Sequence, residues 1–188
     1  MKSLDGVRQP CRARRLLLGL ALLQACSGAA WAQTDEAADE VHVKAAFLYK
    51  FTAYVDWPDS AFDKPDAPFV IGVQGSPALL AELSQLIVGR KVRERSIVLR
   101  KVQSGESPAG LHVFFVGRAE AVHSDASRPV LIVTEAEAGL PRGSMINFRL
   151  VDRHVRFEIA LPGVEKAGLR ISSRLLAVAQ RVVQVEER

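Results

Sequence analysis

Cysteine is missing from most of this chain of 188 residues. Its two cysteines, Cys11 and Cys26, lie among the first 32 residues, and residues 33–188 contain none. A segment without cysteine can form no disulfide, and it offers no thiolate as a nucleophile or redox-active group. Disulfide scaffolds, thiol enzymes and redox sensors are therefore excluded for residues 33–188.

An excess of charge of either sign is also missing from residues 33–188. The full chain has 25 Lys and Arg against 21 Asp and Glu, and the first 32 residues hold five of the former and one of the latter. Residues 33–188 therefore have 20 of each, and the basic pI of about 9.3 comes from the first segment. Nucleic-acid-binding domains depend on clustered positive charge, so we expect no nucleic acid among the partners of this chain.

A membrane-spanning run is absent from the start of the chain as well. The apolar stretch Leu16 to Leu23 is far shorter than the roughly 20 residues that span a bilayer. Basic residues precede it, and Ala30-Trp31-Ala32 follows with small residues at the positions that a signal peptidase recognises. Residues 1–32 are therefore predicted to be a signal peptide that directs the protein to the periplasm. Lipidation of Cys26 is the alternative, since residues 23–26 resemble a lipoprotein cleavage site.

Catalytic motifs are scarce. The four histidines do not have the spacing of metal ligands, and no glycine-rich phosphate loop precedes a lysine. Ser172 and Ser173 lack the glycines of a nucleophile elbow and are better placed to cap a helix. The chain is therefore predicted not to be an enzyme, and to bind neither a metal nor a cofactor.

Hydrophobic patterns nonetheless predict a folded domain over residues 41–188, behind a flexible leader at 33–40. Amphipathic periodicity predicts helices at residues 43–58, 77–88, 119–126 and 172–184. Apolar or alternating runs predict strands at residues 69–73, 92–102, 112–116 and 130–133, and a hairpin of residues 145–151 and 154–161. This order implies a single α/β domain with a mixed β-sheet of about five to six strands, flanked by helices.

One cluster of positive charge lies within residues 90–101, which contain six Lys or Arg and one Glu. Such charges on a strand commonly block unwanted pairing at the edge of a sheet. The alternative is a docking face for an acidic partner or for lipid headgroups. The sequence leaves both interpretations open.

Several segments carry a resemblance to a known family. Residues 43–58 combine Lys, Ala-Ala, Phe-Leu-Tyr-Lys-Phe and Trp-Pro behind the predicted signal, and further characteristic blocks occupy residues 112–117, 143–148, 155–159 and 167–176. In this order they resemble the YfiR-like family of exported proteins. Many members of that family carry disulfides, so the absence of cysteine after the predicted signal means that redox behaviour is not implied for this chain.

The resemblance implies a periplasmic negative regulator without enzymatic activity. Such a protein binds the periplasmic part of an inner-membrane diguanylate cyclase and represses it, which lowers cyclic di-GMP and biofilm formation. The resemblance further implies an outer-membrane-associated lipoprotein as a second partner, and a homodimer. The alternative function is a periplasmic small-molecule-binding module, for which a pocket at a strand end of an α/β domain would serve.

The partner-binding surface is expected on the C-terminal hairpin and on the turn into the last helix. Strand alternation sends Phe157 and Leu161 to one face and Glu158 to the other. One face must pack on the core. At a sheet edge, Glu158 would be a polar contact beside apolar groups, and Glu158→Lys would weaken binding with little loss of fold. The expected contact residues are Phe157, Glu158, Leu161, Val164, Leu169 and Ile171.

Overall fold

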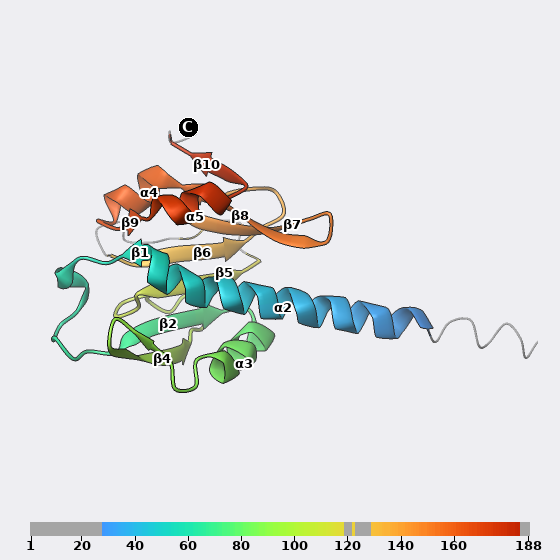
Figure 1. Ribbon diagram of the computed structural model, residues 1–188, viewed down its shortest axis with the longest axis horizontal. Helices are drawn as coiled ribbons and strands as arrows, with labels where there is room; N and C mark the ends of the chain where they lie inside the picture. Colours follow the sequence, from blue (N-terminus) through green and yellow to red (C-terminus); the bar gives the residue numbers. More distant parts are fainter. Residues whose placement is uncertain (1–27, 119–121, 123–128, 185–188) are drawn as a thin grey trace, which may run out of the picture. The chain divides into compact units, whose positions relative to one another are not determined.

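The computed structural model describes residues 28–118, 122 and 129–184 (Figure 1). Its contacts divide the chain into two units, Met1–Ala38 and Asp39–Arg188. Only the start of helix α2 (Gly28–Tyr54) is described in the first unit, whereas the sheet and the other helices belong to the second. Most of the predicted signal peptide lies outside the described residues. The leader expected to be flexible at 33–40 is helical, since α2 begins well before residue 43.

An eight-stranded sheet forms the centre of the second unit, in the spatial order β10-β8-β7-β6-β5-β2-β4-β3. In chain order its strands are β2 (Phe69–Gln74), β3 (Lys91–Val92), β4 (Arg95–Lys101), β5 (Val113–Gly117), β6 (Leu131–Glu135), β7 (Ile146–Val151), β8 (His154–Ala160) and β10 (Arg181–Val183). A separate small sheet joins β1 (Val55–Asp56) to β9 (Arg170–Ile171). The shorter helices are η1 (Asp59–Ala61), α3 (Pro77–Leu86), α4 (Leu161–Lys166) and α5 (Ser173–Val178).

The predicted α/β fold is confirmed, but the sheet has more strands than the expected five to six. The additional strands, β3 and β10, have two and three residues, which is too short for a recognisable alternation in the sequence. β3 overlaps the segment 92–102, expected as one strand, at Val92, and a turn at Arg93 and Glu94 separates it from β4. Both residues have positive φ, at 48° and 68°, as the central residues of a type I′ hairpin turn require.

The centre of the sheet is parallel and buried. β4, β2, β5, β6 and β7 pair in parallel with their successive neighbours, and most of β5 and β6 is inaccessible to solvent. Parallel strands that are covered on both faces have continuous apolar sequences, which is why these two strands could be predicted. β7 and β8 form the predicted antiparallel hairpin, with Asp152 and Arg153 at φ of 48° and 61° in its turn.

Helix α2 attaches to the sheet through aromatic side chains. Phe51 is fully buried, and its ring centroid lies 5.8 Å from that of Phe148 on β7 and 5.3 Å from that of Phe157 on β8. Phe47, four residues earlier, lies 5.3 Å from Phe157. Residues four apart share one face of a helix, so the amphipathic pattern of α2 is the pattern of its core-facing side.

Two predicted helices end earlier than expected because strands follow them. α2 ends at Tyr54 and not at Pro58, since β1 pairs with β9. The helix expected at 172–184 ends at Val178, and β10 then adds to the sheet beside β8. The expectation of one continuous C-terminal helix is therefore wrong. The helix expected at 119–126 lies almost wholly outside the described residues.

Candidate functional site

Three of the residues predicted to bind a partner are core residues. Phe157, Val164 and Leu169 are only 2, 1 and 2% exposed. Phe157 belongs to the aromatic cluster against α2, and the Val164 carbonyl accepts a hydrogen bond from the Leu169 N–H at 3.0 Å. In this conformation their side chains stabilise the C-terminal region and are not accessible to a partner.

Leu161 and Ile171 are the predicted apolar contact residues that retain accessible surface, since both are half-buried. Leu161 begins α4 directly after β8. Ile171 pairs with Val55 in the small β1–β9 sheet. Because α4 contacts both β9 and β10, the structure brings the two residues into one folded region.

Glu158 is buried, and only one of its carboxylate oxygens is bonded. Its side chain is 3% exposed, and Oε1 accepts a hydrogen bond from Nη1 of Arg149 at 3.2 Å. Oε2 is buried with no hydrogen-bond partner in the described part of the chain. The edge position considered for Glu158 is wrong, because β10 pairs with β8 and places Arg181 opposite Glu158. A lysine at position 158 is consequently expected to destabilise the fold.

Asn147 organises the loop that follows β6, although sequence patterns did not point to it. It is fully buried, and its Oδ1 accepts hydrogen bonds from Thr134 Oγ1 at 2.8 Å and from the Ala136 N–H at 2.9 Å. Its Nδ2 donates to the carbonyls of Ala136 and Gly139, at 3.0 and 3.1 Å. These bonds engage both ends of the amide, so Asn147 holds the loop. An Asn inside an apolar strand is the sequence signal for such a role.

His112 is fixed in an aromatic stack immediately before β5. Its ring lies 4.5 Å from the centroid of Phe62 and 4.8 Å from that of Phe69. Nδ1 accepts a hydrogen bond from the Val70 N–H at 3.0 Å, and Nε2 lies 3.1 Å from the Ala61 carbonyl oxygen. This pattern requires the neutral ring to carry its proton on Nε2. Both nitrogens are engaged, so His112 is not free to act as a base or a metal ligand.

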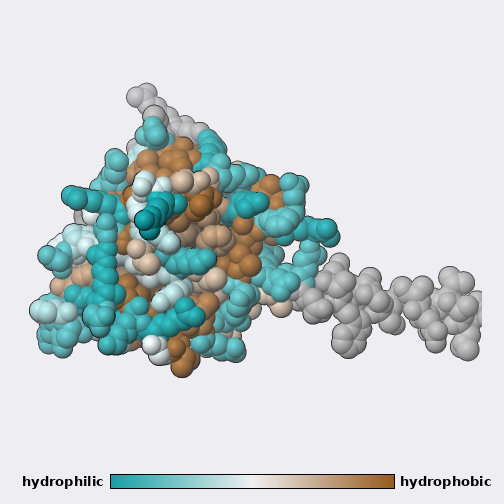
Figure 2. All heavy atoms as spheres, in the orientation of Figure 1, coloured by the Kyte–Doolittle hydropathy of each residue, from teal (hydrophilic) through white to brown (hydrophobic). Residues whose placement is uncertain are grey.

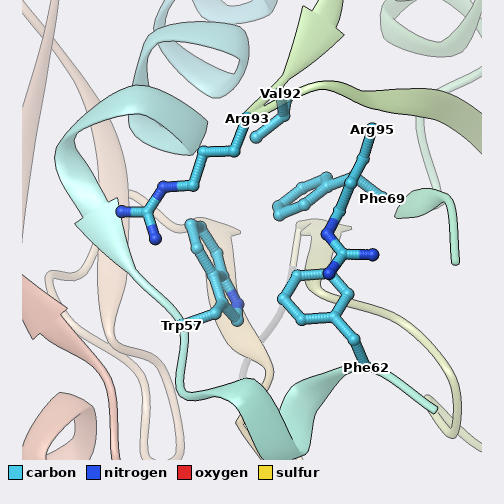
Figure 3. A pocket seen from close by; sticks show the side chains of 6 residues that line it. All are labelled: Trp57, Phe62, Phe69, Val92, Arg93 and Arg95. Carbon is cyan, nitrogen blue, oxygen red and sulfur yellow. The ribbon is translucent and has the colours of Figure 1, made fainter. Parts of the chain in front are cut away.

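Arg95 and Trp57 contact this stack, and Figure 3 shows them beside two of its rings, Phe62 and Phe69. The Arg95 guanidinium lies over the Phe62 ring, 3.8 Å from its centroid, and donates to the Ala67 carbonyl at 2.8 Å. Trp57 donates its Nε1–H to the His112 carbonyl at 3.1 Å. The cavity between these side chains has a volume of about 10 Å³, which is room for one water at most. Burial lowers the pKa of His112, and the charge of Arg95 acts in the same direction.

A wider groove, with a volume of about 450 Å³, lies at the amino ends of β2, β5 and β6. Ser60, Asp63 and His112 line it together with mostly apolar neighbours. Ligands of open α/β sheets usually bind at the carboxyl ends, where chain connections diverge. In this protein a Cβ on Gly75, after β2, would lie 3.1 Å from the carbonyl oxygen of Gly117, which ends β5. The two backbones therefore approach each other closely at the carboxyl ends of β2 and β5, whereas the groove lies at the amino ends.

The buried charged groups of the described region, Lys44 and Glu158, both form ion pairs. Lys44 is 4% exposed, and its Nζ lies 3.0 Å from Oε1 of Glu135 and also pairs with Glu40. Among the described residues, no three His, Cys, Asp or Glu side chains gather as metal ligands would. Within the same residues, no helix has the length and apolar character needed to cross a membrane.

Hydrophobic side chains on the face shown in Figure 2 lie in several patches between polar ones. Three of the most exposed large hydrophobic residues are Val88, Val178 and Leu150, at 77, 64 and 53%. They follow α3, end α5 and lie on β7, respectively, so they come from different parts of the fold. Single exposed apolar residues of this kind are normal on protein surfaces and do not by themselves mark a binding site.

Comparison with known proteins identifies the family. The YfiR/HmsC-like family matches residues 41–180, from α2 to the residue before β10. No curated protein matches this chain. The matched region contains the aromatic face of α2, the parallel centre of the sheet and the β7–β8 hairpin, and it amounts to well over half of the chain. The protein therefore belongs to the YfiR/HmsC-like family, a family of regulatory proteins.

Proposed function

We propose that this protein is a periplasmic negative regulator that binds an inner-membrane diguanylate cyclase and represses it, which lowers cyclic di-GMP and biofilm formation. Membership of the YfiR/HmsC-like family over residues 41–180 carries the proposal. The interior agrees with a binding protein, since the buried Lys44, Asn147 and His112 are engaged with neighbouring groups. Export to the periplasm depends on the predicted signal peptide at residues 1–32.

Repression follows from a difference in affinity for two states of the cyclase. A regulator that binds the inactive state more tightly shifts the population toward that state. Moving the inactive fraction from 1% to 99% requires a preference of about 10⁴-fold. The contact surface must therefore distinguish two arrangements of the partner. A surface whose apolar and charged groups complement only one of the two arrangements can do so.

We propose that the cyclase contacts the region around Leu161 and Ile171 and, on the preceding β7–β8 hairpin, the half-exposed Arg149. The buried side chains of Phe157, Val164 and Leu169 stabilise the fold of this region. Glu158 contributes by orienting Arg149, to which it is hydrogen-bonded at 3.2 Å. Apolar groups with a charged neighbour fit an interface in which a few central residues supply most of the affinity.

We further propose that an outer-membrane-associated lipoprotein relieves repression by competing for the regulator, and that the regulator is a homodimer. Both proposals rest on family likeness. Competition requires that the two partners cover overlapping surface. A cyclase complex that forms in the absence of the lipoprotein and dissociates when it is added would support this part of the proposal.

Direct binding tests the proposal. The exported chain is mixed with the periplasmic part of a diguanylate cyclase from the same organism, and the dissociation constant is measured. We expect a complex that Leu161→Arg weakens at least about tenfold, as for a residue at the centre of an interface. Leu150→Arg, at a leucine 53% exposed on β7, is the matched control and should bind normally. Thermal unfolding of both variants separates a loss of binding from a loss of fold.

The absence of a complex between the unmodified proteins, with every candidate cyclase of that organism, would contradict the proposed function. Equal weakening by Leu161→Arg and Leu150→Arg would contradict only the proposed contact region. Normal binding by a correctly folded Leu161→Arg variant would do the same.

The groove favours a second candidate function, the binding of a small molecule. Its volume of about 450 Å³ lies within the range of ligand pockets, roughly 300–1,000 Å³. A thermal-shift screen of periplasmic metabolites tests this function, with Ala67→Trp as a variant expected to fill the groove. A stabilising ligand that loses its effect in this variant would support it, and a screen without any such ligand would weigh against it.

A further inference from the structure

Strand β4 leaves most of its outer edge unpaired within the described part of the chain. On its inner side, Ile97 to Lys101 pair in parallel with β2. On its outer side, β3 reaches only Arg95 and Ser96. The remainder of β4 therefore ends this side of the sheet, near α3 in Figure 1. An unpaired strand edge presents N–H and C=O groups to which another strand can add.

Alternation along β4 determines which backbone groups are free. The N–H of Val102, directly after β4, donates to the Val73 carbonyl on β2 at 3.0 Å. In a parallel ladder, alternate residues direct both backbone groups to the same neighbour, so the other even-numbered residues at the end of β4 also bond to β2. The odd-numbered residues Ile97, Leu99 and Lys101 direct their N–H and C=O groups outward. Their spacing matches the hydrogen-bond repeat of an added strand.

Positive charge surrounds this edge. Residues 90–101 contain six Lys or Arg and one Glu. Arg95 and Arg100 donate hydrogen bonds to backbone carbonyls, which are neutral and therefore do not neutralise the two positive charges. Part of this charge is offset, because Arg93 pairs with Asp56, Lys91 lies 3.5 Å from Glu94, and Glu106 lies 4.0 Å from Nε of Arg100. Lys101 is exposed and forms no ion pair with a described residue. A strand that adds here therefore meets cations at both ends of the free edge.

The same charges disfavour a second copy of this chain as the added strand. Pairing of two β4 strands through the free residues Ile97 to Lys101 would bring two copies of the positively charged segment 90–101 side by side. Charges of the same sign repel each other at such short range. An acidic strand in the same place would put carboxylates opposite these cations instead. The charge pattern thus selects against self-pairing and in favour of an acidic segment.

We propose that the outer edge of β4, from Ile97 to Lys101, is a docking site for an extended acidic segment of a partner protein, which adds to the sheet as a further strand. Backbone hydrogen bonds to Ile97, Leu99 and Lys101 hold the segment, and the cations around the edge select its charge. This site lies at the opposite end of the strand order from β10 and the region around Leu161, and it is independent of the proposed repression of a cyclase.

Two short synthetic peptides, blocked at both ends, test the site. In one, Glu alternates with Val, and in the other Lys replaces every Glu. Backbone amide signals of the full exported chain are followed by NMR while each peptide is added. We expect the acidic peptide to shift the amides of Ile97, Leu99 and Lys101 and to protect them from hydrogen exchange. The basic peptide should leave them unchanged.

Variants of Lys101 separate the charge from the backbone. Lys101→Ala removes the charge and keeps the N–H, and should weaken binding of the acidic peptide about twofold to fivefold, as for an exposed ion pair. Lys101→Pro also removes the outward N–H, and should weaken binding by a further factor of about three to ten. A proline is tolerated where an edge N–H faces solvent, so the fold should survive. If the proline variant does not fold, Lys101→Glu replaces it, and it should reduce the preference for the acidic peptide over the basic one by more than Lys101→Ala does.

Several results would overturn the proposal. One is that the acidic peptide shifts none of these amides at millimolar concentration, and another is that both peptides bind equally. A concentration-dependent dimer that Lys101→Pro abolishes would assign the edge to a second copy. Binding to anionic vesicles through the same residues, without binding of the acidic peptide, would assign it to a lipid surface.

Discussion

Phe51 of α2 and Phe157 of β8 lie edge to face, with ring centroids 5.3 Å apart and an interplanar angle of 72°. They are 106 residues apart in the sequence, and their contact joins the first helix to the C-terminal hairpin. Edge-to-face aromatic pairs add about 0.5–1.5 kcal/mol to the free energy of burial alone. The contact region proposed for the cyclase is thus held in place by a helix from the other end of the domain.

Phe157→Ala should therefore destabilise the protein strongly. Removal of a buried phenylalanine leaves a cavity and costs about 3–5 kcal/mol in the free energy of unfolding. Urea denaturation measures this loss. Leu150→Ala on the neighbouring strand is the control, because that leucine is 53% exposed and its loss should cost no more than about 0.5 kcal/mol. Equal effects of the two substitutions would contradict the burial assigned to Phe157.

Glu158→Lys should destabilise the fold by about 3–5 kcal/mol, since it replaces one partner of a buried ion pair with a like charge beside Arg149. Glu158→Gln keeps an oxygen that can accept from Arg149 and should cost less, about 1–3 kcal/mol. Arg156→Gln, at an exposed neighbour on β8, should change little. Chemical denaturation of the three variants compares these losses. A Glu158→Lys variant as stable as the unmodified protein would show that this carboxylate is accessible.

Stability should fall as the pH decreases through the range of His112. Burial lowers the pKa of His112 below 6.5, so the unfolded chain binds a proton at a pH at which the folded protein does not. The stabilisation from neutral His112 is therefore complete well above pH 6.5 and declines below it, by at most about 1.4 kcal/mol per pH unit. Urea denaturation at several pH values, compared with His112→Gln, isolates this contribution. Identical pH profiles for the two proteins would refute it.

Arg95→Leu should loosen the loop between β1 and β2 without unfolding the sheet. It removes the contact with Phe62 and the hydrogen bonds to the carbonyls of Lys64 and Ala67. Cation–π contacts of this kind contribute about 0.5–2 kcal/mol. Hydrogen exchange should accelerate at the amides of residues 61–67 and stay slow in β5. The pKa of His112 should also rise, because a nearby positive charge is lost.

The parallel centre of the sheet could be predicted because its physical signal is local. β5 and β6 are covered on both faces, so nearly every side chain is apolar. Strand β10 could not be predicted, because Val182 and Val183 fit an amphipathic helix as well as a strand. Pairing with β8 decides between them, together with the hydrogen bond from the Gln180 N–H to the Phe157 carbonyl. Contacts between distant segments leave little trace in a local pattern.

The candidate contact residues show the same limit. Strand alternation placed Phe157 and Glu158 on opposite faces of β8. It could not reveal that β10 pairs with β8 and helps to bury Glu158. Val164 and Leu169 are apolar positions in a short helix and a turn, where periodicity does not separate core from surface. The aromatic stack around His112 combines Phe62 from a loop, Phe69 from β2 and His112 from the residue before β5, so no sequence spacing reveals it.

The level of cyclic di-GMP in cells tests the proposed repression most directly. It is measured in the parent strain, in a strain lacking this gene, and in that strain with the gene restored. Deletion should raise cyclic di-GMP, and restoration should return it to the parental level, because the cyclase would be active only without its regulator. An unchanged level after deletion, under conditions in which the parent strain produces and exports the protein, would contradict this function.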